Sequence, residues 1–121
     1  MELKEAKHKA LEYQFEDVTF LVKPEADEAD RLEVELSGRL KEHNGAKVME
    51  YSTADYCKTV IRCMVVGWKG VKRGGHDVPY SFDELKHFPH VKGKNVFLDL
   101  GDFVIKNTDI RDQRNDDLKK D

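Results

Sequence analysis

The sequence contains no apolar run close to the roughly 20 residues that a helix needs to cross a bilayer. Residues 1–7 mix lysine and glutamate with aliphatic side chains, and they lack the apolar core of a secretory signal peptide. Neither a transmembrane segment nor secretion is expected. We expect a cytoplasmic protein that makes no contact with a membrane.

Basic residues are not in excess either. The chain has 21 lysines and arginines against 24 aspartates and glutamates, which gives a net charge of −3. Proteins that bind DNA or RNA usually carry a basic stripe, because contacts with phosphate supply much of their affinity. Here the two signs are mixed along most of the chain, so we expect no nucleic-acid partner.

Cysteine is scarce, with only Cys57 and Cys63. If both lie on one helix, their separation of six residues places them about 240° apart, which argues against a disulfide. We interpret both as buried thiols.

Histidine offers a weak case for a metal site. The ligand types of a zinc site are present in His76, His87, His90 and a cysteine. Pro89 interrupts the helix between the two histidines, and the chain has neither Cys-x-x-Cys nor His-Glu-x-x-His. We therefore expect no metal and no other cofactor.

Local signatures of catalysis are also missing. The one glycine-rich stretch, residues 67–75, matches neither common phosphate-binding pattern. Ser52 and Ser81 stand where helix caps are expected, and no nucleophile motif surrounds them. We expect a protein that is not an enzyme.

What the chain does contain is 39% hydrophobic and 37% charged residues, which is typical of a globular domain with a heavily charged surface. From Asp109 onward nearly every residue is charged or an amide, and only Ile110 and Leu118 are apolar. We expect one compact domain over residues 1–108 and a charged, flexible tail over residues 109–121.

The N-terminal part predicts strands. Residues 13–23 alternate aromatic or β-branched side chains with polar ones, and the alternation breaks once, at Glu16-Asp17. This pattern indicates a half-buried strand or a tight strand pair, which Pro24 closes.

Residues 25–42 allow two interpretations. Alanines and leucines from Ala26 to Leu40 have helical spacing, yet residues 32–36 alternate like a strand and Gly38 weakens a helix interior. The length of the stripe favours a helix over residues 25–42, which His43-Asn44-Gly45 would end.

The most regular helix is predicted after an N-cap at Ser52 or Thr53. Its broad apolar face should form the centre of the core, and it holds Cys57, Ile61, Met64, Val65 and Trp68, with Val60 at its margin. Gly67 and Gly70 should end or bend this helix. Residues 71–79 then predict a tight loop or small hairpin around Gly74-Gly75.

Two further helices complete the prediction. Ser81 and Glu84 form a capping box for a short helix that Pro89 ends, and residues 94–106 have helical apolar spacing. The expected fold class is α+β but mostly helical, with an N-terminal strand or strand pair followed by three to four helices and a disordered tail.

One succession of motifs carries a functional indication. An apolar helix runs into Trp68-Lys69-Gly70-Val71, a glycine-containing turn follows, and Val78-Pro79-Tyr80-Ser81 opens a short helix that ends at Phe88-Pro89. The succession resembles the tail assembly chaperones of long-tailed, siphovirus-type bacteriophages. The resemblance is tight over about a third of the chain. The motif residues should pack into a compact cluster that fixes the fold. They are Trp68, Gly70, Val71, Pro79 and Ser81.

The resemblance implies a cytoplasmic chaperone that keeps the tape measure protein soluble, brings tail tube subunits to it, forms homo-oligomers and is absent from the mature virion. The alternative is another phage structural component, such as a head-tail connector or a minor tail protein. The family motif supplies no contact residues. From the residues themselves we predict a protein-binding surface at Leu32, Leu36 and Leu40, since a core of this size need not cover every amphipathic face.

Overall fold

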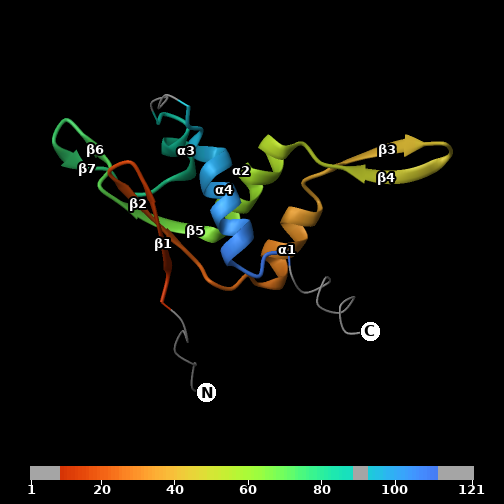
Figure 1. The fold of residues 1–121 in the computed structure, drawn as a ribbon, viewed down its shortest axis with the longest axis horizontal. Helices are drawn as coiled ribbons and strands as arrows, with labels where there is room; N and C mark the ends of the chain where they lie inside the picture. The colour runs from red at the N-terminus through yellow and green to blue at the C-terminus, as the bar shows by residue number, and fades with distance from the viewer. Residues whose placement is uncertain (1–8, 89–92, 112–121) are drawn as a thin grey trace, which may run out of the picture.

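The computed structural model describes residues 9–88 and 93–111. Within these residues, 36% are helical and 30% are in strands, and the chain forms four helices and three small sheets (Figure 1). The prediction of a mostly helical fold is therefore wrong, and the fold is mixed α+β. In chain order the elements are β1 (Leu11–Phe15), β2 (Val18–Val22), α1 (Glu28–Glu35), β3 (Arg39–His43), β4 (Ala46–Glu50), α2 (Thr53–Met64), β5 (Val65–Lys69), β6 (Lys72–Arg73), β7 (His76–Asp77), α3 (Phe82–Leu85) and α4 (Val96–Asn107).

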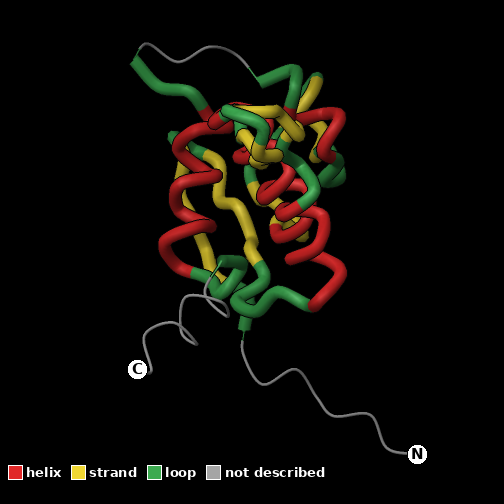
Figure 2. The backbone as a smooth tube through the Cα atoms, turned by 90° about the vertical axis from the view of Figure 1, so that its right-hand side faces the viewer, coloured by secondary structure: helices red, strands yellow, loops and turns green. Residues whose placement is uncertain are grey.

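The main sheet has the order β1-β2-β5 and is antiparallel throughout. The predicted strand pair is confirmed as β1 and β2, which join at a turn where Glu16 has a φ of 54°. Phe20 and Val22 on β2 are fully buried. Figure 2 shows the helices and strands lying side by side. Helices α2 and α4 pack against each other, and their buried residues share one core with those of the sheet.

The predicted helix through Trp68 is wrong, because α2 ends at Met64 and β5 begins at once. Val65 and Trp68 therefore lie on a strand, where Trp68 is opposite Phe20. The β-branched Val65 and Val66 favour an extended chain at this point, and Gly67 disfavours continuation of the helix. The edge of β2 provides the hydrogen bonds that hold β5 in the sheet. Helix propensity is a local property and does not reveal this long-range pairing.

The predicted helix over residues 25–42 is also wrong, because it merges α1 with β3. Asp27 and Asp30 form the capping box that starts α1, and the helix ends at Glu35 with Leu36 as its C-cap. Asn44 and Gly45 have φ of 51° and 81°, the left-handed pair that suits a two-residue hairpin turn. The Asn-Gly signal that was interpreted as a helix stop joins β3 to β4 instead.

The start of α2 and the position of α4 match their predictions, whereas α3 ends at Leu85 and is shorter than predicted. The side chain of Ser52 caps α2, and that of Asn95 accepts hydrogen bonds at the start of α4. Ser81 precedes α3 but makes no side-chain capping bond, so the predicted capping box is wrong. Glu84 instead forms an ion pair with Arg73 at 2.6 Å.

Helices α2 and α4 touch closely at one glycine. A Cβ placed on Gly101 would lie 2.7 Å from the Cβ of Cys57 and 2.8 Å from its Sγ. Because glycine has no side chain, the two helices approach more closely here than a larger residue would allow. This contact holds α4 along one side of α2.

The first residues of the predicted tail lie against the domain. The carboxylate of Asp109 accepts a hydrogen bond from the amide of Ala26 at 2.7 Å and pairs with Arg31 at 2.9 Å. Ile110 is buried in the core. The rest of that prediction, residues 112–121, lies outside the described residues. The predicted extension of α3 through Phe88 is wrong, because the helix ends at Leu85.

Candidate protein-binding surface

Exposed apolar side chains are concentrated in one region of the described chain. Of the large exposed hydrophobic residues, all but Val66 come from α1 and its C-cap, the β3–β4 segment or α4: Leu32, Leu36, Leu40, Val48, Met49, Tyr51 and Leu98. Scattered single apolar residues are normal on a protein surface, whereas a gathered set marks an interaction site.

The three leucines predicted to bind partners are all more than half exposed, at 54% for Leu32, 63% for Leu36 and 62% for Leu40. They do not form one helical stripe. Leu32 lies on α1, Leu36 is its C-cap and Leu40 lies on β3. They follow one another along the chain from the helix into the hairpin.

The sequence interpretation missed two residues that extend this surface. Met49 is opposite Leu40 in the hairpin register. A Cβ on Gly38 would lie 2.7 Å from the Cγ of Met49 and 2.8 Å from the Cε1 of Tyr51, so both side chains lie close to the start of the hairpin. We call the set Leu32, Leu36, Leu40, Met49 and Tyr51 the apolar strip.

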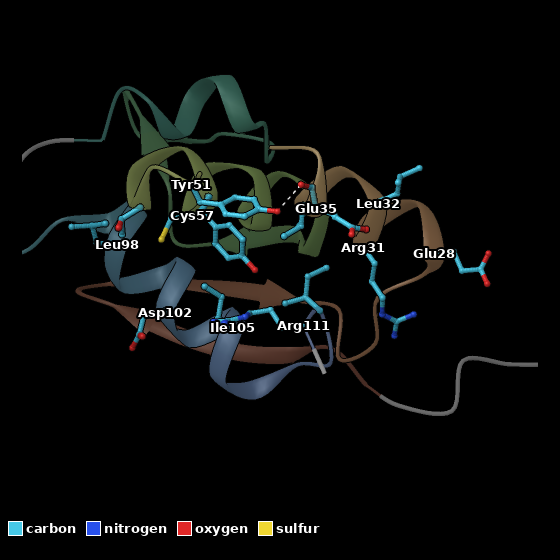
Figure 3. A pocket seen from close by; sticks show the side chains of 14 residues that line it. Glu28, Arg31, Leu32, Glu35, Tyr51, Cys57, Leu98, Asp102, Ile105 and Arg111 are labelled. Carbon is cyan, nitrogen blue, oxygen red and sulfur yellow. Dashed lines mark hydrogen bonds between the residues drawn. The ribbon is translucent and has the colours of Figure 1, made fainter. Parts of the chain in front are cut away.

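Beside the apolar strip is an open groove of about 1120 Å³ (Figure 3). Helix α1 lines one side and α4 the other, and α2 contributes the residues between them. Its lining residues are Glu28, Arg31, Leu32, Val34, Glu35, Tyr51, Thr53, Tyr56, Cys57, Leu98, Asp102, Ile105, Ile110 and Arg111.

The groove combines an aromatic pair with aliphatic neighbours. The rings of Tyr51 and Tyr56 meet edge to face at 5.5 Å, and the guanidinium of Arg111 lies 5.9 Å from the centre of the Tyr56 ring. Burial raises the pKa of Tyr56, while Arg111 lowers it by a smaller amount. The hydroxyl of Tyr51 donates a hydrogen bond to the carbonyl oxygen of Glu35 at 2.8 Å, which fixes the position of the Tyr51 ring.

Carboxylates stand on both sides of the groove. Glu28 and Glu35 come from α1, and Asp102 comes from α4 (Figure 3). The charge of Arg31 is offset by Asp109, to which it is ion-paired. The α1 side of the groove therefore carries two carboxylates, Glu28 and Glu35.

The five motif residues lie outside this surface, and three of them, Trp68, Gly70 and Val71, make contacts that stabilise the fold. Trp68 is 9% exposed, as expected for a core residue, and its ring packs near those of Phe20, Tyr80 and Phe88. Gly70 has a φ of 93°, and a Cβ there would lie 2.6 Å from the carbonyl oxygen of Asp17. Val71 accepts a hydrogen bond from the amide of Val78. Pro79 is exposed, and Ser81 precedes α3.

The thiols and histidines do not meet at one place. Cys57 and Cys63 are both free, and their pKa values are raised by burial. His76 is on β7 and His87 follows α3, while His90 lies outside the described residues. Across residues 9–88 and 93–111, no group of three or more histidine, cysteine or acidic side chains is arranged to hold a metal ion.

Comparisons with known proteins give no family. No protein-family model, no curated protein and no solved structure matches the chain. None of the helices in the described part of the chain combines the length and the apolar character needed to cross a membrane.

Proposed function

We propose that this protein is a tail assembly chaperone of a long-tailed bacteriophage, which binds the tape measure protein and brings tail tube subunits to it. The observation that carries the proposal is the apolar strip, whose five exposed side chains come from α1, its C-cap and the β3–β4 segment. The motif succession from Trp68 to Ser81 supports the proposal through its resemblance to that family, and Trp68 and Gly70 in it make contacts that fix the fold.

A chaperone for a long helical protein needs an accessible apolar surface. An amphipathic helix binds such a surface with side chains at intervals of three and four residues. Leu32 on α1 and Leu36 at its C-cap offer apolar side chains to such a helix, and Leu40 and Met49 extend the surface onto the hairpin. A protein that presents these residues to solvent gains by covering them with an apolar partner.

The second candidate is another phage structural component, such as a head-tail connector or a minor tail protein. The hairpin of β3 and β4 favours it, because both strands are exposed along their whole length and project from the body (Figure 1). Projecting strands can interlock with neighbouring subunits. Purified virions distinguish the two candidates, since an assembly chaperone is absent from them and a structural component is retained.

Co-expression tests the chaperone proposal. The tape measure protein of the same phage is produced with the wild-type chain, with Leu36→Glu and with the control Val66→Glu, and its soluble fraction is measured. Val66 is 53% exposed but lies on β5, outside the apolar strip. Wild type and the control should keep the partner soluble, and Leu36→Glu should not.

Circular dichroism of both purified variants confirms that they remain folded. If the partner aggregates equally with and without the wild-type chain, the proposal is wrong. If Leu36→Glu and Val66→Glu reduce solubility equally, the apolar strip is not the binding surface.

A further inference from the structure

We infer that strand β1 of one copy of this chain pairs antiparallel with β1 of a second copy, around a two-fold axis at Tyr13. The pairing joins the two main sheets into one continuous sheet. It uses the β1 edge, which Figure 1 shows on the side of the body away from the β3–β4 hairpin. The apolar strip therefore stays exposed, and the inference goes beyond the proposed function without depending on it.

The outer edge of β1 presents backbone groups that its own sheet does not use. Within residues 9–88 and 93–111, β2 is the only strand that pairs with β1. Just after β2, the amide of Lys23 donates to the carbonyl oxygen of Met64 at 2.8 Å, on the side of β5. Because bonding direction alternates along a strand, the even-numbered residues of β2 bond toward β1. Their partners on β1 are Leu11, Tyr13 and Phe15. The N–H and C=O groups of Glu12 and Gln14 therefore point outward.

Strand β1 lacks the features that usually prevent edge pairing. Proteins protect their edge strands with prolines, lysines, bulges or covering segments. Strand β1 contains no proline, glycine or lysine, and its register with β2 is regular over its whole length. Its one charged residue, Glu12, is paired with Lys69 of its own sheet at 3.7 Å. The other edge strand, β5, contains Gly67 and has a shifted register with β2, so β1 is the better edge for a further strand.

The apolar core is half open beside this edge. The rings of Tyr13 and Phe103 lie 4.8 Å apart, and both are only partly buried, as is Leu11. In a pair centred on Tyr13, Leu11 lies opposite the partner's Phe15 and the two Tyr13 residues face each other. The open side of one core would then be covered by the same side of the other, which removes apolar surface from water.

Charge selects this register. In a pair centred on Tyr13, Lys9 of each copy lies opposite Asp17 of the other. Both side chains are exposed, and neither forms an ion pair with another described residue. A register centred on Glu12 would instead place this residue opposite itself and Lys9 opposite the partner's Phe15. The arrangement around Tyr13 thus gives two matched lysine–aspartate pairs, one at each end of the joined strands.

Sedimentation velocity of the full chain tests the pairing by charge reversal. Wild type should dimerise with rising concentration. Lys9→Asp and Asp17→Lys each place like charges opposite each other at both ends, so each variant alone should associate at least about threefold more weakly at low salt. An equimolar mixture of the two should recover the wild-type affinity, because every facing pair then joins a lysine to an aspartate. Leu36→Glu, in the apolar strip, should dimerise as wild type does.

A second pair of variants tests the backbone of the edge. Glu12→Pro removes an N–H group that points away from its own sheet, whereas the control Glu12→Ala keeps it. Glu12→Pro should dimerise at least about tenfold more weakly than Glu12→Ala. Circular dichroism checks that both remain folded, and the exposed charge reversals decide the matter if Glu12→Pro does not fold.

Four results would overturn the inference. The first is a wild-type chain that stays monomeric, and the second is a mixture of Lys9→Asp and Asp17→Lys that associates no better than either alone. The third is loss of dimerisation in Leu36→Glu, which would show that the copies meet through the apolar strip. The fourth is dimerisation that appears only after removal of residues 1–8, which would show that this segment occupies the edge.

Discussion

The indole Nε1 of Trp68 donates a hydrogen bond to the carbonyl oxygen of Val78 at 2.7 Å. Val78 in turn donates its amide to Val71, so the bond ties β5 to the far side of the β6–β7 hairpin. The ring is enclosed by three other aromatic side chains. One residue thus joins the sheet, the small hairpin and the segment that leads to α3.

Replacing Trp68 should therefore destabilise the whole domain. We expect Trp68→Ala to lower the free energy of unfolding by about 3–5 kcal/mol, because it empties a buried aromatic site. Trp68→Phe keeps much of the ring but loses the donor, and it should cost about 1 kcal/mol for the lost hydrogen bond, with a further loss from the smaller ring. Urea unfolding followed by circular dichroism measures both. A Trp68→Ala variant with the wild-type midpoint would show that the ring does not support the core.

Gly70 and Gly74 provide a matched pair of glycines. Both have positive φ, at 93° and 59°, but a Cβ on Gly70 would meet the carbonyl oxygen of Asp17 at 2.6 Å whereas a Cβ on Gly74 would have open space around it. We expect Gly74→Ala to cost about 1–2 kcal/mol from backbone strain, and Gly70→Ala to cost clearly more. Thermal unfolding of the two variants checks this order, and equal losses would contradict the role of the Asp17 contact.

Local pattern predicted some elements of this fold well and others badly. The alternation of residues 13–23 and the apolar spacing of residues 94–106 each matched a single secondary structure, and both were predicted correctly. The prediction for residues 65–68 was wrong because Val65 and Trp68 also fit the apolar spacing of the preceding helix. The local pattern therefore did not show where the helix ends. Only the long-range pairing with β2 decides the conformation there.

The proposed binding surface was only partly visible in the sequence. The exposure of Leu32, Leu36 and Leu40 was predicted from a surplus of apolar faces. The groove was not, because it depends on how α1 and α4 flank α2, and no local signal carries that arrangement. The Asn44-Gly45 pair did indicate a hairpin, but the longer leucine stripe led to the prediction of a helix.

Cys63 gives a prediction that depends on pH. Burial, together with a hydrogen bond from its Sγ to Glu33 Oε2 at 3.1 Å, raises the pKa of Cys63 to about 12. The folded protein thus favours the neutral thiol, and this contribution to stability is present below the ordinary thiol pKa of about 8.5 and is lost as pH rises toward 12. In a Cys57→Ala background, the thiol should react slowly with a disulfide reagent near its ordinary pKa.

Glu33→Gln is the test variant for this environment. It removes the carboxylate that disfavours the thiolate, so the pKa of Cys63 should fall and the reaction should become faster at the same pH. Rates measured as a function of pH give the pKa directly. A reaction in the folded protein that is as fast as that of an unfolded peptide would contradict the buried, hydrogen-bonded thiol.

Co-purification tests most directly whether the apolar strip binds the tape measure protein. The tagged chain is produced together with the tape measure protein and isolated by affinity chromatography, and the amount of retained partner is quantified for wild type, Leu36→Glu and Val66→Glu. Wild type and Val66→Glu should retain the partner equally, and Leu36→Glu should lose at least about tenfold of it. No retention by wild type, or full retention by Leu36→Glu, would contradict binding through this surface.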